Sequence, residues 1–287
     1  MIKKLLLILI CLPFLNFAQQ TYISDTNFEQ ALINLGYDVL LDNYVTTSSI
    51  DTISFLDVSN QNISDLTGIE DFYSLQIFKC NSNQITTINL SNNLNLSSLE
   101  VRWNLLSSIN VNQNTLLDSL DCRNNLLNNL DINNNLSLIS LRCSHNQLTN
   151  LDVSHNLNLT HLDCDYNQLI HLDVSQNDHL ISFGCSNNLL TNLDITNNNE
   201  LIWLYCWNNE LTTLNLDNNI VLLELYCSGN SINYLDVSDC VSLEQLVCWQ
   251  NQLITLDLNN NSNLWYLSCS LNQLDSLDVS NLPNLLL

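Results

Sequence analysis

The cysteines are the residues with the most obvious chemical potential, because they recur at a fixed interval. The 287-residue sequence has 11 cysteines, and nine of them are spaced by 21 or 42 residues: Cys80, Cys122, Cys143, Cys164, Cys185, Cys206, Cys227, Cys248 and Cys269. Many cysteines in a secreted chain usually indicate disulfides. Here Val101 fills the same place in its own repeat, and identical side chains projecting in parallel do not chelate a metal ion. We therefore expect buried free thiols that act as compact apolar residues, with disulfides as the alternative.

A column of carboxylates follows the same interval. It comprises Asp131, Asp152, Asp173, Asp194, Asp236, Asp257 and Asp278, with Asn89, Asn110 and Asn215 in the other repeats. Like charges about 5 Å apart repel by about 1 kcal/mol per neighbour even in water. Solvent, local hydrogen bonds or bound cations must relieve that repulsion. The sequence favours a solvated face that discourages aggregation. Calcium binding is the alternative, although no D-x-D-x-D-G loop supports it.

The basic residues and several aromatic residues occupy three alternate positions around the first strand of each repeat. The predicted ligand-binding set is Lys79, Arg102, Arg123, Arg142, His161, Asp163, Trp203, Tyr205, Trp207, Tyr226, Trp249 and Tyr266. Trp103 and Trp265 lie just beside it. Exposed aromatic rings are preferred anchors at protein interfaces and also stack on sugars, and a local basic patch could steer an acidic partner. Alternatively, Glu100 and Asp121 neutralise the basic residues while the aromatic residues pair across neighbouring strands.

The sequence contains no catalytic signature. It has no G-x-S-x-G, H-E-x-x-H or P-loop motif, and its five histidines are scattered over outward or loop positions: His145, His155, His161, His171 and His179. His161 and Asp163 could form only a weak pair, without a nucleophile nearby. Because an enzyme needs titratable groups that converge in a pocket, we expect a non-enzymatic protein without a cofactor.

All these columns are positioned by a 21-residue repeat. An apolar leucine returns every 21 residues from Leu75 to Leu285 without insertion, and each unit reads L-x-x-L-x-C-x-x-N-x-L-x-x-L-D-V-S-x-N-x-x. Residues 53–74 are a 22-residue first coil, which gives eleven coils. In L-x-L-x-C, alternation points Leu and Cys inward and the variable residues outward, as in a strand. L-D-V alternates in the same way, so we predict two parallel sheets and coils stacked at about 4.8 Å.

Two asparagine columns accompany the leucines. The first runs without exception from Asn83 to Asn272, and the second is interrupted by Cys240 and Leu282. A buried amide can bond the backbone of its own and neighbouring coils. We expect both columns to be structural.

The repeat unit resembles the leucine-rich-repeat signature. The first coil resembles internalin-type repeats, and the 21-residue units are similar to the nested bacterial class called IRREKO. The stretch TYISDTNFEQALINLGYDVLLDNYV resembles the cap of secreted repeat proteins of flavobacteria. The resemblance covers residues 53–287 and implies a mainly β repeat solenoid. Such proteins often end in a sorting domain, whereas this sequence ends at SNLPNLLL without a polar cap. We expect either a fragment or an edge that another chain covers.

The residues before the repeats divide into two parts. Residues 1–18 resemble a secretory signal peptide, with Lys3 and Lys4 before an apolar stretch too short to span a bilayer and Ala18 for cleavage. Residues 19–52 form the predicted N-terminal cap. It contains a short helix that starts with a capping box from Thr26 to Glu29 and ends at Gly36, and this helix covers the open apolar edge of the first coil.

Composition limits the partners of the chain. The formal net charge is −23, and after residue 18 only four basic residues remain against 29 acidic ones. This balance argues against nucleic-acid and anionic-membrane binding, and no later segment is a candidate for membrane insertion. We predict a secreted or cell-surface binding or adhesion module that recognises a protein through the variable face of the first strand. The alternatives are carbohydrate binding by the Trp and Tyr side chains, and a structural surface protein stabilised by cations on the Asp column.

Overall fold

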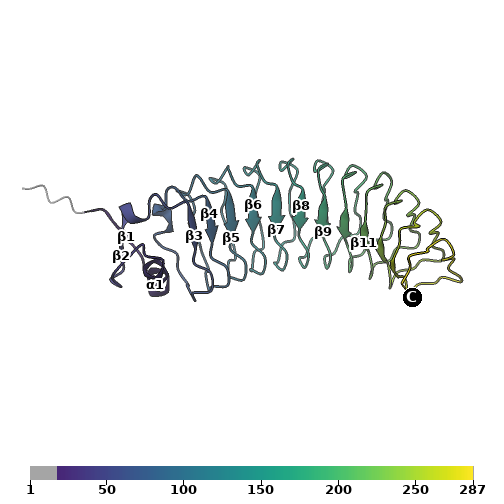
Figure 1. The fold of residues 1–287 in the computed structure, drawn as a ribbon, viewed down its shortest axis with the longest axis horizontal. Coiled ribbons are helices and arrows are strands. Elements are labelled where there is room, and N and C mark those ends of the chain that lie inside the picture. The colour runs from purple at the N-terminus through teal and green to yellow at the C-terminus, as the bar shows by residue number, and fades with distance from the viewer. Residues whose placement is uncertain (1–17, 287) are drawn as a thin grey trace, which may run out of the picture.

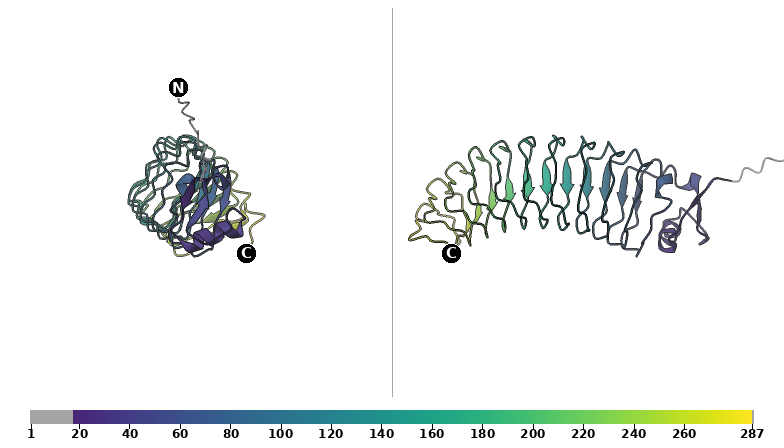
Figure 2. Two further views of the ribbon diagram at one scale, coloured as in Figure 1. Left: turned by 90° about the vertical axis from the view of Figure 1, so that its left-hand side faces the viewer. Right: turned by 180° about the vertical axis from the view of Figure 1, so that it is seen from behind.

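The computed structural model describes residues 18–286 of the chain. The predicted signal peptide therefore lies almost wholly outside the described residues. The chain forms an elongated, gently bowed array, with the N-terminal cap at one end (Figures 1 and 2). No helix within the described range has the length and apolar character needed to cross a membrane.

One long parallel sheet runs along the array. Its eleven strands are β3 (Phe55–Asp57), β4 (Ile77–Lys79), β5 (Ser98–Glu100), β6 (Ser119–Asp121), β7 (Ser140–Arg142), β8 (His161–Asp163), β9 (Ser182–Gly184), β10 (Trp203–Tyr205), β11 (Glu224–Tyr226), β12 (Gln245–Val247) and β13 (Tyr266–Ser268). Neighbouring strands pair in phase, so that Lys79 lies opposite Glu100 and Glu100 opposite Asp121. The predicted mainly β repeat solenoid is confirmed.

The interior is a continuous stack of inward-pointing side chains. In a central coil, Leu141 and Cys143 are fully buried, and the same holds for the equivalent residues of the neighbouring coils. All ten cysteines of the described residues are free thiols, which confirms the preferred prediction over disulfides. Burial raises the pKa of these thiols, for Cys206 to about 12. Since the thiolate is the reactive form, the fully buried cysteines are inert packing residues, whereas Cys269 is only partly buried.

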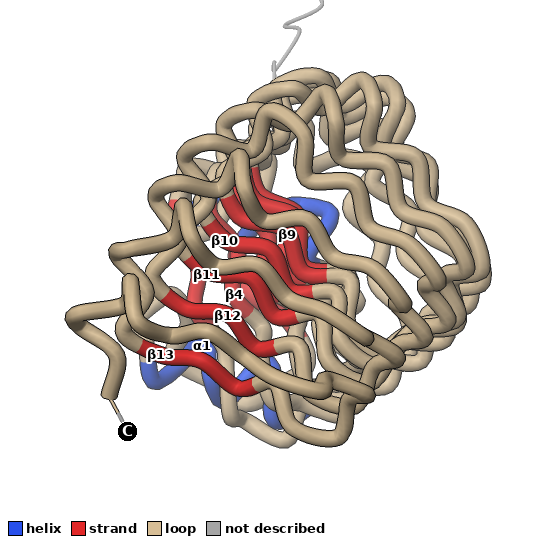
Figure 3. Tube along the Cα trace, turned by 90° about the vertical axis from the view of Figure 1, so that its right-hand side faces the viewer, coloured by secondary structure: helices blue, strands red, loops and turns tan. Residues whose placement is uncertain are grey.

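The predicted second sheet is wrong for the described residues, where the strands occupy one side of each coil (Figure 3). In the L-D-V half the backbone groups find other partners. The N–H of Asn133 donates to Asp131 Oδ1 at 3.2 Å, and the N–H of Asn135 donates to the Ile132 carbonyl at 3.0 Å. The side-chain amide of Asn135 donates to the Val111 carbonyl of the preceding coil at 3.0 Å. Turns and side chains thus replace the ladder of a sheet.

The first asparagine column holds neighbouring coils together. Asn188 Nδ2 donates to the carbonyls of Cys164, one coil earlier, and Cys185, in its own coil, at 3.1 and 3.0 Å. Its Oδ1 accepts the N–H of Leu169 at 3.0 Å. The same pattern recurs along the array. Each amide therefore satisfies backbone groups that no strand partner reaches.

The N-terminal cap consists of a hairpin and a helix. Strand β1 (Gln20–Tyr22) pairs antiparallel with β2 (Tyr44–Thr46), and α1 (Thr26–Asn34) lies between them in the chain. Short 3₁₀ turns follow at η1 (Thr47–Ser49) and η2 (Ile69–Asp71). The buried ring of Phe28 stacks on Phe72 of the first coil with centroids 6.4 Å apart. The helix covers the apolar edge as predicted.

The predicted capping box is wrong, although the predicted helix end is right. Asp25, one residue earlier, caps the helix by accepting the N–H groups of Asn27 and Phe28. Glu29 is buried and instead accepts the N–H groups of Asp42 and Tyr44. Its carboxylate thus anchors the returning strand. At the other end, Gly36 adopts a φ of 82°, a left-handed conformation that glycine takes without strain.

Candidate binding face

The outward residues of the long sheet form one wall, and the twelve predicted site residues all belong to it. Five end their strands: Lys79, Arg142, Asp163, Tyr205 and Tyr226. Three begin their strands: His161, Trp203 and Tyr266. Four lie two residues beyond a strand end: Arg102, Arg123, Trp207 and Trp249. In-phase pairing therefore places side chains from distant parts of the sequence on a common surface.

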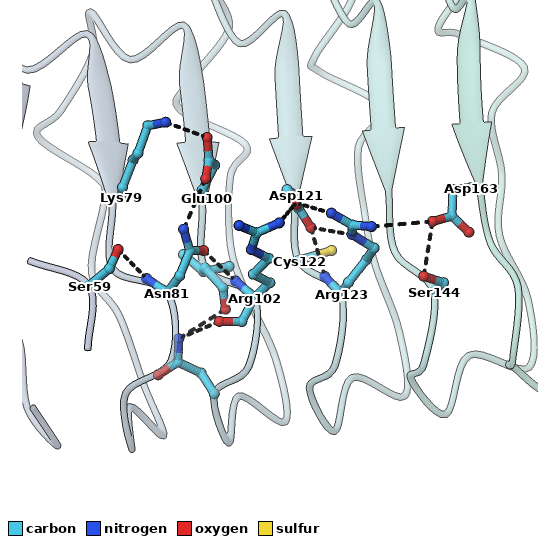
Figure 4. Close-up of polar contacts among 12 residues, drawn as sticks. Ser59, Lys79, Asn81, Glu100, Arg102, Asp121, Cys122, Arg123, Ser144 and Asp163 are labelled. Atoms are coloured by element: carbon cyan, nitrogen blue, oxygen red, sulfur yellow. Dashed lines mark hydrogen bonds and ion pairs between the residues drawn. The ribbon is translucent and has the colours of Figure 1, made fainter. Parts of the chain in front are cut away.

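The basic residues of the first half are already paired within the face (Figure 4). Lys79 Nζ lies 2.8 Å from Glu100, whose carboxylate also accepts the side-chain amide of Asn81 at 2.9 Å. Burial opposes ionisation of Glu100, yet the bonds from Lys79 and Asn81 leave its pKa below the usual value. Glu100 thus neutralises Lys79, as the alternative to a free basic patch predicted.

Asp121 neutralises two further cations. Its side chain is only 8% exposed and takes a bidentate contact from Arg123, with Nε at 2.9 Å and Nη2 at 2.7 Å. Arg102 Nη1 lies 3.8 Å from the same carboxylate, and Arg123 Nη1 lies 4.0 Å from Asp163. Within the described residues Arg142 is exposed and makes no ion pair.

The aromatic residues of the second half partly cover one another. The rings of Tyr205 and Tyr226 meet edge to face with centroids 5.2 Å apart. The Tyr205 hydroxyl donates to Glu224 at 2.7 Å, and the Tyr226 hydroxyl bonds Gln245 at 2.7 Å. Trp203, Trp207 and Trp249 are half-buried, whereas Tyr266 is 42% exposed. Cross-strand pairing therefore accounts for much of this cluster, but leaves ring surface in contact with solvent.

A second group of rings lies along the edge of the face, outside the predicted set. Trp103, His145 and Tyr166 occupy the turn after the strand, where φ lies between 52° and 57°. The rings of His145 and Tyr166 stack at 4.1 Å, and Trp103 is 59% exposed. The sequence carried a signal for this turn, since the equivalent positions include Asn124, Asn187, Asn208 and Gly229. Residues of these types tolerate the left-handed conformation.

A notch opens over β9, where the outward side chains become small. Its volume is about 280 Å³. It is lined by Arg142, His161, Leu162, Asp163, Asp165, Ser182, Gly184 and Tyr205. The Nδ1 atom of His161 lies 2.8 Å from Thr160 Oγ1, so this ring nitrogen is turned toward its neighbour in the chain. The β9 notch thus lies between the carboxylates of Asp163 and Asp165 and the aromatic ring of Tyr205.

Asp165 is the most perturbed carboxyl group of the notch. Desolvation, followed by repulsion from Asp163, raises its pKa to about 7. The N–H of Ser186 donates to Asp165 Oδ1 at 2.6 Å, which opposes this rise. Asp163 accepts a hydrogen bond from Ser144 at 3.0 Å. Repeat phase places Asp165 on the outward face, but its perturbed environment was not predicted, because it depends on burial and on Asp163.

The Asp column has a local structural role. Asp152 Oδ1 accepts the N–H and the hydroxyl of Ser154 at 3.0 and 2.7 Å, and these bonds lower the Asp152 pKa. Asn110 accepts the N–H of Asn112 in the same way at 3.0 Å, which explains why Asn replaces Asp in some repeats. No three His, Cys, Asp or Glu side chains gather as a metal site within residues 18–286.

No protein-family model and no curated protein matches the chain. The solved functional domain of InlJ from Listeria monocytogenes, described as including a cysteine ladder, is 33% identical with a TM-score of 0.79. That similarity covers 93% of this chain and 65% of the other, so this chain spans slightly less than two thirds of that length. The internalin inlF of Listeria monocytogenes is 21% identical with a TM-score of 0.62, covering 92% and 94%.

A plant structure has the same fold. The ectodomain of the Arabidopsis thaliana receptor kinase GASSHO1/SCHENGEN3, solved with Casparian strip integrity factor 2, is 22% identical with a TM-score of 0.66, covering 79% of this chain and 34% of the other. The neighbours are internalin-type and receptor-ectodomain repeat proteins. The chain is thus a parallel β-solenoid with a leucine-rich-repeat fold and about 21 residues per coil.

Proposed function

We propose that this chain is a secreted or cell-surface module that binds a protein through the outward face of the long sheet, with its centre at β8–β10. The observation that carries the proposal is the β9 notch between charged and aromatic residues. A concave site with a few convergent polar groups is the default candidate for binding a ligand group, here a side chain of a partner protein. The resemblance of residues 1–18 to a signal peptide supports export.

The fold favours this surface over the rest of the molecule. Its backbone is fixed by the strand ladder, so the side chains are presented without a loop having to become ordered. Binding then loses less conformational entropy than it would on a mobile surface. Partly exposed Tyr and Trp residues are the types that dominate protein interfaces. Adhesion is the cellular role that this arrangement fits.

The test is a binding screen against panels of extracellular proteins and glycans. The probe is the full chain, compared with a variant carrying Trp203→Ser, Tyr205→Ser and Trp207→Ser. A matched control replaces three exposed apolar residues away from the strands, Leu136→Ser, Tyr234→Ser and Ile254→Ser. We expect a protein in the screen to bind the wild type and the control with similar affinity. The same protein should bind the face variant at least tenfold more weakly.

Two outcomes would contradict the proposal. Loss of binding in the control alone would place the partner on the loops. Glycan binding that depends on the three aromatic residues would instead support the carbohydrate alternative. Circular dichroism of both variants verifies that the solenoid is intact before the binding data are compared.

A further inference from the structure

The β9 notch has two walls of different chemistry. On one side β8 and the turn after it contribute His161, Asp163 and Asp165, and on the other side β10 contributes Tyr205. Between them lies Gly184, directly opposite Tyr205 in the register. A Cβ atom at Gly184 would lie 3.1 Å from Asp165 Oδ1. The missing side chain therefore leaves this carboxylate accessible from the notch.

The carboxylates of the notch have incomplete partners within the described residues. Asp165 receives the Ser186 N–H but no cation, and the nearest cationic nitrogen to Asp163 is Arg123 Nη1 at 4.0 Å. That arginine is already committed to Asp121 through its two short contacts. Both carboxylates are partly buried, and a partly buried charge without a close counter-charge is less favourable than a paired one. An incoming cation would relieve this penalty.

The opposite wall suits a cation as well. Tyr205 lines the notch while its hydroxyl donates to Glu224, which adds another negative charge beyond the ring. A guanidinium or ammonium group over a tyrosine ring is attracted by the negative face of the ring. Carboxylates on one side and an aromatic ring on the other would therefore both favour a positive group between them.

We propose that the β9 notch receives an arginine or lysine side chain of the protein partner, whose docking surface is basic. This inference rests on the proposed function and specifies its partner. It agrees with the balance of 6 basic and 29 acidic residues in the chain. The basic residues that first suggested an acidic partner are mostly occupied, because Glu100 and Asp121 pair with Lys79, Arg102 and Arg123. Arg142 lines the notch and opposes a cation there, as does the Arg123 guanidinium 4.0 Å from Asp163.

The direct test uses N-acetyl-arginine amide as the probe and the full chain as the receptor. N-acetyl-citrulline amide has nearly the same shape without the charge. Binding is followed by the shift of the Gly184 backbone amide resonance during titration with each probe. We expect the arginine probe to bind with at least fivefold higher affinity than the citrulline probe. Arg142→Gln should strengthen binding about twofold by removing the like charge. Asp163→Asn with Asp165→Asn should weaken it at least fivefold.

A steric variant tests the notch independently of charge. Gly184→Val fills the notch and should abolish the shift. The strand backbone accepts valine, because Val247 occupies the equivalent position of β12, although the Asp165 carboxylate must move slightly away from the new Cβ. Ser268→Val, at the equivalent position of β13, is the matched control and should bind as the wild type. Equal binding of arginine and citrulline, or binding unaffected by Gly184→Val, would overturn the assignment.

The acidic-partner alternative has its own readout. N-acetyl-glutamate amide would then bind in place of the arginine probe, and Arg142→Gln would abolish its binding. A protein found in the screen separates the two proposals. If its binding requires the aromatic residues but tolerates Gly184→Val and the Asp variants, only the notch assignment fails. If the arginine probe binds the notch but no protein requires the face, the proposed function fails and the notch remains.

Discussion

At the scale of single residues, Asp165 in the β9 notch makes the stability of the fold depend on pH. Its pKa of about 7 in the folded chain exceeds the ordinary value of 3.8, mainly through desolvation and then through Asp163. The folded state therefore binds more protons than the unfolded state between these two values. The stability that protonation supplies is fully present below about pH 4 and is lost as the pH rises through 7.

Asp165→Asn should therefore stabilise the protein in a pH-dependent way. At pH 8 we expect the free energy of unfolding to increase by about 1–3 kcal/mol, and at pH 4 to change little. Asparagine keeps the shape and can still accept the Ser186 N–H. Chemical denaturation at the two pH values measures the difference. Because Asp163, His161, Arg142 and Tyr205 also line the notch, only the comparison of variant with wild type isolates Asp165, and an equal change at both pH values would contradict this account.

Two arginines on one carboxylate should differ in importance. Arg123 makes the bidentate contact to buried Asp121, whereas Arg102 is more exposed and lies 3.8 Å away. Arg123→Ala would leave a buried charge poorly paired, so we expect a loss of about 3 kcal/mol in unfolding free energy. Arg102→Ala serves as the control and should cost less than about 1 kcal/mol. Similar losses in urea denaturation would show that the geometry does not rank the two contacts.

At the scale of elements, side-chain alternation was a good guide to the strands. It predicted the inward Leu and Cys of L-x-L-x-C and the in-phase stacking of neighbouring coils, both of which the sheet contains. The same alternation failed for L-D-V, because it reports where side chains point and not where backbone groups bond. Asp131 accepts the N–H of Asn133 locally, so a strand-like pattern does not produce a second ladder there.

The candidate site was predictable as a face but not as a set of contacts. Repeat phase placed Lys79 and Glu100 on neighbouring strands, and the possibility of pairing was visible in the sequence. Which contacts form depends on side-chain reach and on burial by the next coil. Asp165 lies two residues beyond its strand, like Arg102 and Trp207, but was left out of the predicted set, and Trp103 was placed only beside that set. Their environments arise from turns that only the stacked coils define.

The asparagine column gives a prediction at this scale. Asn188→Ala removes the bonds to the Cys164 and Cys185 carbonyls and the acceptor for Leu169 N–H. We expect a loss of about 3 kcal/mol in unfolding free energy, because these backbone groups become unpaired in the interior. Asn272→Ala, in the last coil, is the comparison. Its bonds are of the same kind but more exposed, so water can replace them and the loss should be smaller.

At the scale of the whole molecule, burial falls off toward the last coil. Cys206 and Cys227 are fully buried, whereas Cys269 and its neighbour Leu267 are only partly buried. A stack of coils is covered on both sides in its middle and on one side at its end. Accessibility of the thiols should therefore follow position along the array.

Thiol reactivity measures this gradient. In a chain carrying Cys11→Ser, we expect Ellman's reagent to modify Cys269 first, at least tenfold faster than the other thiols, because reaction there needs only local opening. Cys269→Ser should remove the fast phase and leave the slow one. A fast phase that persists in this variant would mean that the stack opens elsewhere.

The row of free thiols also bears on the redox conditions under which the protein folds. Because no covalent cross-link joins the coils of the described residues, dithiothreitol should leave the unfolding midpoint unchanged. Assembly then needs neither an oxidant nor an isomerase. The array can therefore form under reducing conditions as readily as under oxidising ones.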